Sequence, residues 1–165
     1  ALFGGFTLVK SLDPLEVLQI PTPSDLFAVV IHPQIEIKTS DARKILPKTI
    51  ALKDAITQWS NVGSLIHGLH INNYDLISRS LKDVVVEPFR SQLIPGFENI
   101  KKTALAYGAL GTGISGSGPS VFSLCKSKTS ALDVEKAIRK TYKKEDIPFE
   151  IYVSKINLNG IKHLK

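Results

Sequence analysis

Glycine and serine residues are concentrated between Gly111 and Ser120, where the sequence reads GTGISGSGPS. Glycine lets the backbone turn at positive φ and lets other groups approach it closely, while serine hydroxyls and free backbone N–H groups in such a turn can bind an anion. The spacing is neither that of a P-loop, which ends in Gly-Lys-Ser/Thr, nor the dinucleotide-binding Gly-x-Gly-x-x-Gly. Composition alone favours a turn or flexible connector. Ile114 as an apolar anchor within the loop and Pro119, which rigidifies its exit, argue against a flexible linker.

Composition and charge narrow the classes of partner. The chain has 165 residues, of which 43% are hydrophobic and 22% are charged, which suits one globular domain. The net charge of +6 suits an anionic ligand such as a nucleotide, a phosphate or a carboxylate. It would also suit nucleic acid, but the basic residues do not alternate with aromatic ones as in an RNA-binding strand, so no nucleic-acid partner is expected.

Two further features concern location. No apolar segment approaches the length of a membrane span, so no membrane partner is expected. Cys125 is the only cysteine and lies in an apolar segment, which predicts a buried, inert thiol. A lone free thiol fits a reducing compartment, and the expected location is the cytoplasm.

Apolar periodicity predicts the elements that must position the glycine-rich segment. Strands are expected at 3–9, 17–20, 26–32, 120–125 and 149–156, and the tail at 158–164 is a candidate edge strand. Helices are expected at 41–46, 49–69, 72–82, 97–107 and 130–144, with a helical turn at 88–93. The helix at 49–69 is expected to be amphipathic, because apolar residues recur at steps of three or four at Leu52, Ile56, Trp59, Val62, Ile66 and Leu69.

This order of elements predicts a single α+β domain over residues 1–165. Strands and helices are largely segregated, which indicates a mainly antiparallel sheet covered by helices on one side. The strand–helix–strand unit at 120–156 resembles half of a split, ferredoxin-like βαβ arrangement. The segment at 26–32 is nearly all apolar, as expected of a central strand.

Several segments resemble those of the small-molecule kinases that include galactokinase, homoserine kinase, mevalonate kinase and phosphomevalonate kinase. GISGSGPSVF at 113–122 is similar to the third conserved motif of that superfamily. TSDARKILP at 39–47 is similar to the T-x-x-A-R-x-x-L-P segment of homoserine kinases, and EPFR at 87–90 with LIPGF at 93–97 resembles their E-P-x-R-x-x-L-I-P-G-F segment. The opening ALFGGFTLV resembles the stretch that follows their H-x-D-N-V-A-P sequence.

The resemblance implies ATP-dependent phosphorylation of the side-chain hydroxyl of L-homoserine, with ATP and Mg²⁺ as cofactors. It implies that Arg43 and Arg90 hold the carboxylate of the substrate, with Thr39 and Gly116 nearby. A guanidinium group suits this role because it can bind a carboxylate through two parallel hydrogen bonds. From the residues alone, Arg43 could equally be a solvated side chain and Arg90 could pair with Glu87 or Asp83.

The same resemblance assigns a supporting role to the glycine-rich loop. The residues expected to shape the site from below are Gly113, Ser115, Gly116, Ser117, Gly118, Pro119 and Ser120. No catalytic residue and no metal ligand are assigned to this chain, because its histidines have no metal-binding spacing and its carboxylates form no evident pair.

The phosphate loop of the superfamily, P-x-x-x-G-L-G-S-S-A, does not occur in this sequence, nor does the upstream acidic residue that contacts the substrate amino group. We therefore expect the C-terminal half of a homoserine kinase, inactive alone, with an ATP-binding N-terminal half as its partner. Leu2, Phe3 and Phe6 are expected to face that half, and a homodimer is conceivable. Two other classes stay open: another kinase of the superfamily, and a non-catalytic ferredoxin-like module that binds an amino acid or nucleic acid.

Overall fold

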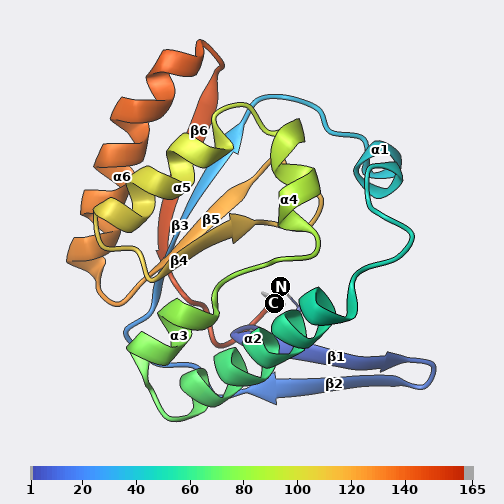
Figure 1. The fold of residues 1–165 in the computed structure, drawn as a ribbon. Helices are drawn as coiled ribbons and strands as arrows, with labels where there is room; N and C mark the ends of the chain where they lie inside the picture. The colour runs from blue at the N-terminus through green and yellow to red at the C-terminus, as the bar shows by residue number, and fades with distance from the viewer. Residues whose placement is uncertain (1, 162–165) are drawn as a thin grey trace.

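The computed structural model describes residues 2–161 and has a four-stranded antiparallel sheet at its centre (Figure 1). The strand order is β4-β5-β3-β6. These strands are β3 (Phe27–Pro33), β4 (Gly111–Ile114), β5 (Val121–Cys125) and β6 (Phe149–Lys155). Helices α5 (Phe97–Ala106) and α6 (Lys128–Tyr142) cover one face of the sheet. The predicted α+β class is therefore confirmed.

The main core lies between that face and the two helices. Val29 and Ile31 of β3 are buried there, and Val121 and Cys125 of β5 join them because residues two apart on a strand share a face. Strand β3 has a partner on each side, as its apolar sequence predicted. Strands β5 and β6 both pair with β3 and are joined by α6, which confirms the predicted split βαβ arrangement.

A second layer of structure lies below the sheet in Figure 1. Strands β1 (Phe6–Leu12) and β2 (Leu15–Ile20) form an antiparallel hairpin, next to helices α2 (Leu52–His70) and α3 (Tyr74–Ser80). A smaller apolar cluster of Leu26, Leu69 and Ile77 joins this layer to the chain above it.

Short helical pieces complete the fold. They are α1 (Thr39–Lys44), α4 (Glu87–Arg90) and two 3₁₀ turns, η1 (Ser91–Leu93) and η2 (Lys143–Glu145). Helix α4 lies between the sheet and α1 (Figure 1). No helix within residues 2–161 is both long enough and apolar enough to cross a bilayer.

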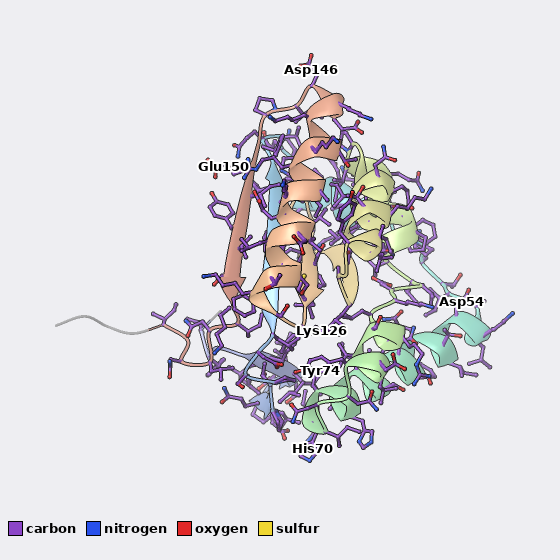
Figure 2. The ribbon with its side chains drawn as sticks, turned by 90° about the vertical axis from the view of Figure 1, so that its left-hand side faces the viewer. Asp54, His70, Tyr74, Lys126, Asp146 and Glu150 are labelled. Atoms are coloured by element: carbon purple, nitrogen blue, oxygen red, sulfur yellow. The ribbon has the colours of Figure 1, made fainter. Side chains whose placement is uncertain are left out.

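The predicted long helix is formed as α2, but most of its apolar stripe is exposed in this chain. Leu69 is buried, but Leu52, Ile56, Trp59 and Val62 are exposed, Trp59 by 65% and Leu52 by 68%. Figure 2 labels Asp54 near the start of α2 and His70 at its end, and shows the helix reaching away from α6. The helical period was read correctly. The C-terminal part of α2 packs against α3 and the cluster around Leu26, and Gln58 and Asn61 hydrogen-bond to the 82–84 segment, but the apolar residues of its N-terminal part are left exposed among residues 2–161.

The glycine-rich segment also differs from expectation, because its first four residues form β4 instead of a loop. Gly111 pairs with Leu124 and Ile114 with Val121, so the loop itself is limited to residues 115–120. Glycine has no side chain to reveal alternation, which is why the strand was missed.

The two chain ends show smaller differences. Strand β1 starts three residues later than the predicted strand at 3–9 and continues to Leu12. Leu2 and Phe3 are exposed, whereas Phe6, expected to face a missing half, packs against the cluster around Leu26. The proposed edge strand at 158–164 is not formed by residues 158–161, and residues 162–165 lie outside the described part of the chain.

Candidate functional site

A cavity of about 380 Å³ opens between α2, α4 and β4. Its wall combines apolar residues with polar and charged groups. The polar and charged residues of the wall include Asn61, Lys82, Asp83, Glu87 and Arg90, and the backbone of Gly113 also lines the cavity. A concave site with a few convergent polar groups is the usual form of a small-molecule binding site.

Arg90 joins three segments at this cavity. Its Nε donates a hydrogen bond to the backbone oxygen of Ala42 in α1 (3.2 Å), and its Nη1 donates one to the backbone oxygen of Gly116 in the glycine-rich loop (2.8 Å). The alternative, an ion pair with Glu87 or Asp83, is not formed. Among residues 2–161, no acceptor is found for Nη2. The guanidinium group is therefore oriented by backbone oxygens and keeps donor capacity for an anionic ligand.

Thr39 and Arg43 lie on α1 and outside the lining of the cavity. Both are exposed, and α1 is anchored through Ala42, which is fully buried. Within the described residues, Arg43 makes no ion pair or side-chain hydrogen bond. The hydrogen bond from Arg90 to Ala42 ties this helix to the cavity wall. The structure thus brings Arg90, Gly113 and Gly116 together at the cavity and leaves Thr39 and Arg43 beside it.

The glycine-rich loop is held by bonds of its own. The amide of Ser115 donates to the backbone oxygen of Ser120 (2.8 Å), and the amide of Gly118 donates to that of Ser115 (3.0 Å). Ser120 Oγ also lies 2.8 Å from His32 Nδ1 on β3. Gly116 and Gly118 have φ values of +61° and +84°, which L side chains rarely adopt. These contacts support the ordered loop over the flexible connector.

Three charged residues near the cavity have roles that the sequence reasoning did not predict: Asp83 and Glu87, which were considered only as partners of Arg90, and Lys101. Asp83 Oδ1 accepts hydrogen bonds from the amides of Val85 and Val86 (2.8 Å each), and its second oxygen accepts one from the amide of Glu87 (3.2 Å). Glu87 forms an ion pair with Lys101 of α5. A turn signal could have identified Asp83, since an aspartate side chain commonly accepts from amides a few residues ahead of it, here just before a short helix with Pro88 in its first turn.

Two further observations concern the reactivity of the single thiol and the capacity of the described residues to bind a metal ion. Cys125 is buried as predicted, and burial raises the pKa of its thiol to about 11, so that it stays protonated near neutral pH. No group of three or more histidine, cysteine, aspartate or glutamate residues within the described residues could hold a metal ion.

Comparison with known proteins identifies the family. Residues 55–144 match the family model described as "GHMP kinases C terminal". The chain belongs to the GHMP kinases. This confirms the superfamily resemblance inferred from the glycine-rich segment and its neighbours. The GHMP kinase match includes the cavity wall from α2 to β5 as well as the glycine-rich loop.

Individual relatives of this GHMP kinase chain carry a more specific name. Homoserine kinase of Chlorobium phaeobacteroides (strain DSM 266 / SMG 266 / 2430) is 47% identical over 166 residues, covering 99% of this chain and 52% of the relative. Homoserine kinase of Chloroherpeton thalassium (strain ATCC 35110 / GB-78) is 45% identical over 165 residues, with coverage of 99% and 52%. The chain thus spans about half the length of the curated relatives it matches.

A solved structure extends the similarity to three dimensions. The crystal structure of homoserine kinase from Cytophaga hutchinsonii ATCC 33406 is 51% identical and superimposes with a TM-score of 0.93. The match covers 96% of this chain and 50% of that chain. The fold described above is therefore the fold of a GHMP kinase C-terminal domain.

Proposed function

We propose that this chain is the substrate-side domain of a homoserine kinase, an enzyme that transfers a phosphoryl group from ATP to the side-chain hydroxyl of L-homoserine. The observation that carries the proposal is Arg90, which is held at the cavity by backbone oxygens while Nη2 is left available. The names of the relatives at 45–51% identity support the same substrate.

In this proposal the cavity and α1 recognise the amino-acid end of the substrate. Arg90 binds the carboxylate, Arg43 approaches it from α1, and Thr39 and Gly116 lie at the same side. Two guanidinium groups would fix the orientation of the carboxylate as well as its charge. Orientation matters here because a phosphoryl-transfer enzyme works largely by positioning its reactants and stabilising charge.

ATP, when bound, supplies the phosphoryl group. The described residues do not fit the triphosphate of ATP, because the sequence lacks the phosphate loop of the superfamily and because two amides of the glycine-rich loop already bond within the loop. We therefore assign ATP binding and the transfer step to the part of the longer protein that corresponds to the other half of its relatives. We place the enzyme in the cytoplasm, in agreement with the free thiol of Cys125.

The surface for that other half is proposed to be the exposed apolar face of α2. Its residues Leu52, Ile56, Trp59 and Val62 form one helical stripe that nothing within residues 2–161 covers. Contiguous exposed apolar patches on a folded domain mark interaction sites. The relatives are about twice as long as this chain, so a second half of similar size is available to cover the stripe.

The first prediction tests the activity itself. The intact protein should produce ADP in the presence of L-homoserine and far less with galactose or mevalonate, whereas the 165-residue chain alone should produce none. A preference for galactose or mevalonate would replace this proposal with another kinase of the superfamily. No ATP consumption with any of these alcohols would favour the non-catalytic module, and turnover by the isolated chain would overturn the division into halves.

The second prediction tests the arginines in the intact protein. Arg43→Ala and Arg90→Ala should each raise the KM for homoserine at least tenfold, because each removes a charge-assisted hydrogen bond worth about 1.5–3 kcal/mol. Arg139→Ala on α6 is the matched control, since this exposed arginine lies outside the cavity lining. An unchanged KM in both test variants would remove the two arginines from the substrate site.

A further inference from the structure

The ion pair between Glu87 on α4 and Lys101 on α5 stands apart from the other ion pairs among residues 2–161. Its side chains are only 12% and 23% exposed, whereas the pairs on the hairpin and on α1 are far more open to solvent, and the pair on α6 is more open on its arginine side. Lys101 Nζ also lies 5.8 Å from the ring centre of Phe97. A buried ion pair costs desolvation free energy, so stability alone does not explain it.

Helix α4 needs such an external support. It has four residues, from Glu87 to Arg90, and helices this short are not stable by themselves. Asp83 orders the turn that leads into α4 through the amides of Val85, Val86 and Glu87, and Arg90 holds the end of the helix through the oxygens of Ala42 and Gly116. The pair of Glu87 with Lys101 is the contact that ties the same helix to α5, which packs against the sheet.

Glu87 and Arg90 lie on the same side of α4. They are three residues apart, which places them on neighbouring positions of the helix surface, and both line the cavity. Glu87 Oε1 faces Lys101, while Oε2 lies 3.7 Å from the point where a Cβ on Gly113 would stand. The carboxylate therefore lies between Lys101 of α5 and the backbone of β4. Because Glu87 and Arg90 belong to the same short helix, a shift of Glu87 would also displace Arg90.

We propose that the Glu87–Lys101 ion pair is a positioning device that sets the place of α4 and thereby orients Arg90 at the cavity. Neither residue is assigned a contact with substrate, and both act through Arg90. The effect on an amino-acid substrate rests on the proposed function, but the effect on α4 and the glycine-rich loop follows from the contacts alone.

The kinetic test uses Glu87→Gln, Lys101→Met and the double variant in the intact protein. Each single change should raise the KM for homoserine about tenfold with kcat changed less than about twofold, because a misplaced Arg90 weakens binding of substrate and transition state alike. The double variant should resemble each single variant, since both remove the same interaction. Glu135→Gln, which breaks the more exposed pair with Arg139 on α6, is the control and should leave KM unchanged.

Comparison of the two single variants also separates positioning from direct binding. If Glu87 bound the substrate ammonium group itself, Lys101→Met would free that carboxylate and would not reproduce the KM increase of Glu87→Gln. An increase in KM for Glu87→Gln alone, or no increase in either variant, overturns the proposal. Where a single variant fails to fold because it leaves a charge unpaired, the double variant is used together with hydrogen exchange. A wild-type KM overturns the proposal, as does a raised KM without faster exchange at the α4 amides, and a raised KM with faster exchange there supports it.

A second measurement does not depend on the substrate. Hydrogen exchange of the intact protein should be faster in Glu87→Gln than in wild type or Glu135→Gln at the α4 amides that bond to Val86 and at Gly118 in the loop. Unchanged exchange at these amides overturns the positioning role. If the wild-type protein does not turn over homoserine, the proposed function fails, and this exchange measurement still tests the inference.

Discussion

Arg43 and Arg90 illustrate what the sequence can and cannot say about single residues. Both arginines were selected by resemblance, and their neighbours in sequence could not separate a solvated side chain from an oriented one. In the structure, Arg90 is fixed by two backbone oxygens from segments 48 and 26 residues away. Arg43 is exposed on α1 and has no such support within residues 2–161. The two arginines differ because of the tertiary structure, since segments distant in the sequence supply the hydrogen-bond acceptors of Arg90.

A third prediction concerns Tyr142, whose hydroxyl is buried without a hydrogen-bond partner among residues 2–161. Burial, with a smaller effect of Glu145, raises the pKa of this hydroxyl to about 12. Its ring packs edge-to-face on Phe149 with 5.2 Å between ring centres. Because an unpaired buried hydroxyl is costly, Tyr142→Phe should leave the free energy of unfolding unchanged or raise it by about 1 kcal/mol.

Urea unfolding of the intact protein measures this effect, and Tyr142→Ala is the comparison. Loss of the whole ring should lower the free energy of unfolding by about 3–5 kcal/mol. A decrease of more than about 1 kcal/mol in Tyr142→Phe would mean that the hydroxyl has a hydrogen-bond partner after all.

At the scale of elements, the strands and helices with strong apolar patterns were predicted, and the helical turn expected at 88–93 is confirmed as α4 followed by η1, whereas the glycine-containing strand β4 was not predicted. Strand β3 and helix α6 follow their patterns closely. Strand β4 was read as loop because Gly111 and Gly113 carry no side chains, and only the pairing with β5 reveals it. Helix α4 is too short for a periodic signal, so its existence depends on Asp83, Lys101 and Arg90.

The fourth prediction concerns the start of α4. Asp83→Ala should lower the free energy of unfolding by about 1–2 kcal/mol, because three amides lose their acceptor. Asp83→Asn should cost less, since its amide oxygen can still accept from Val85 and Val86. Thermal unfolding and hydrogen exchange at residues 85–90 compare the two variants. Equal decreases in the free energy of unfolding would contradict the role of Asp83 as an acceptor for these amides.

At the scale of the whole molecule, the main exposed apolar feature is the face of α2, which no other described residue covers. The fifth prediction is that Trp59→Asp lowers the free energy of unfolding of the intact protein by about 2–4 kcal/mol, although Trp59 is 65% exposed in this chain. Leu132→Asp on α6, also at an exposed apolar position, is the control and should change it by less than about 0.5 kcal/mol.

Urea unfolding checks this pair of variants as well. Equal and small effects of Trp59→Asp and Leu132→Asp would show that the α2 face stays in contact with water in the intact protein. That result would contradict the proposed docking surface without affecting the arginine site, because the two are tested by different measurements.

The sequence by itself determined the α+β class, the central place of β3, the family resemblance and the segments that carry Arg43, Arg90 and the glycine-rich loop. These features depend on local pattern and on residue type, which a single sequence displays directly. Tertiary structure alone decided that Arg90 is braced by Ala42 and Gly116, that Glu87 meets Lys101, and that the stripe on α2 faces outward. The physical reason is that each of these depends on which distant groups come within hydrogen-bonding or packing distance, and periodicity along the chain does not specify the partner.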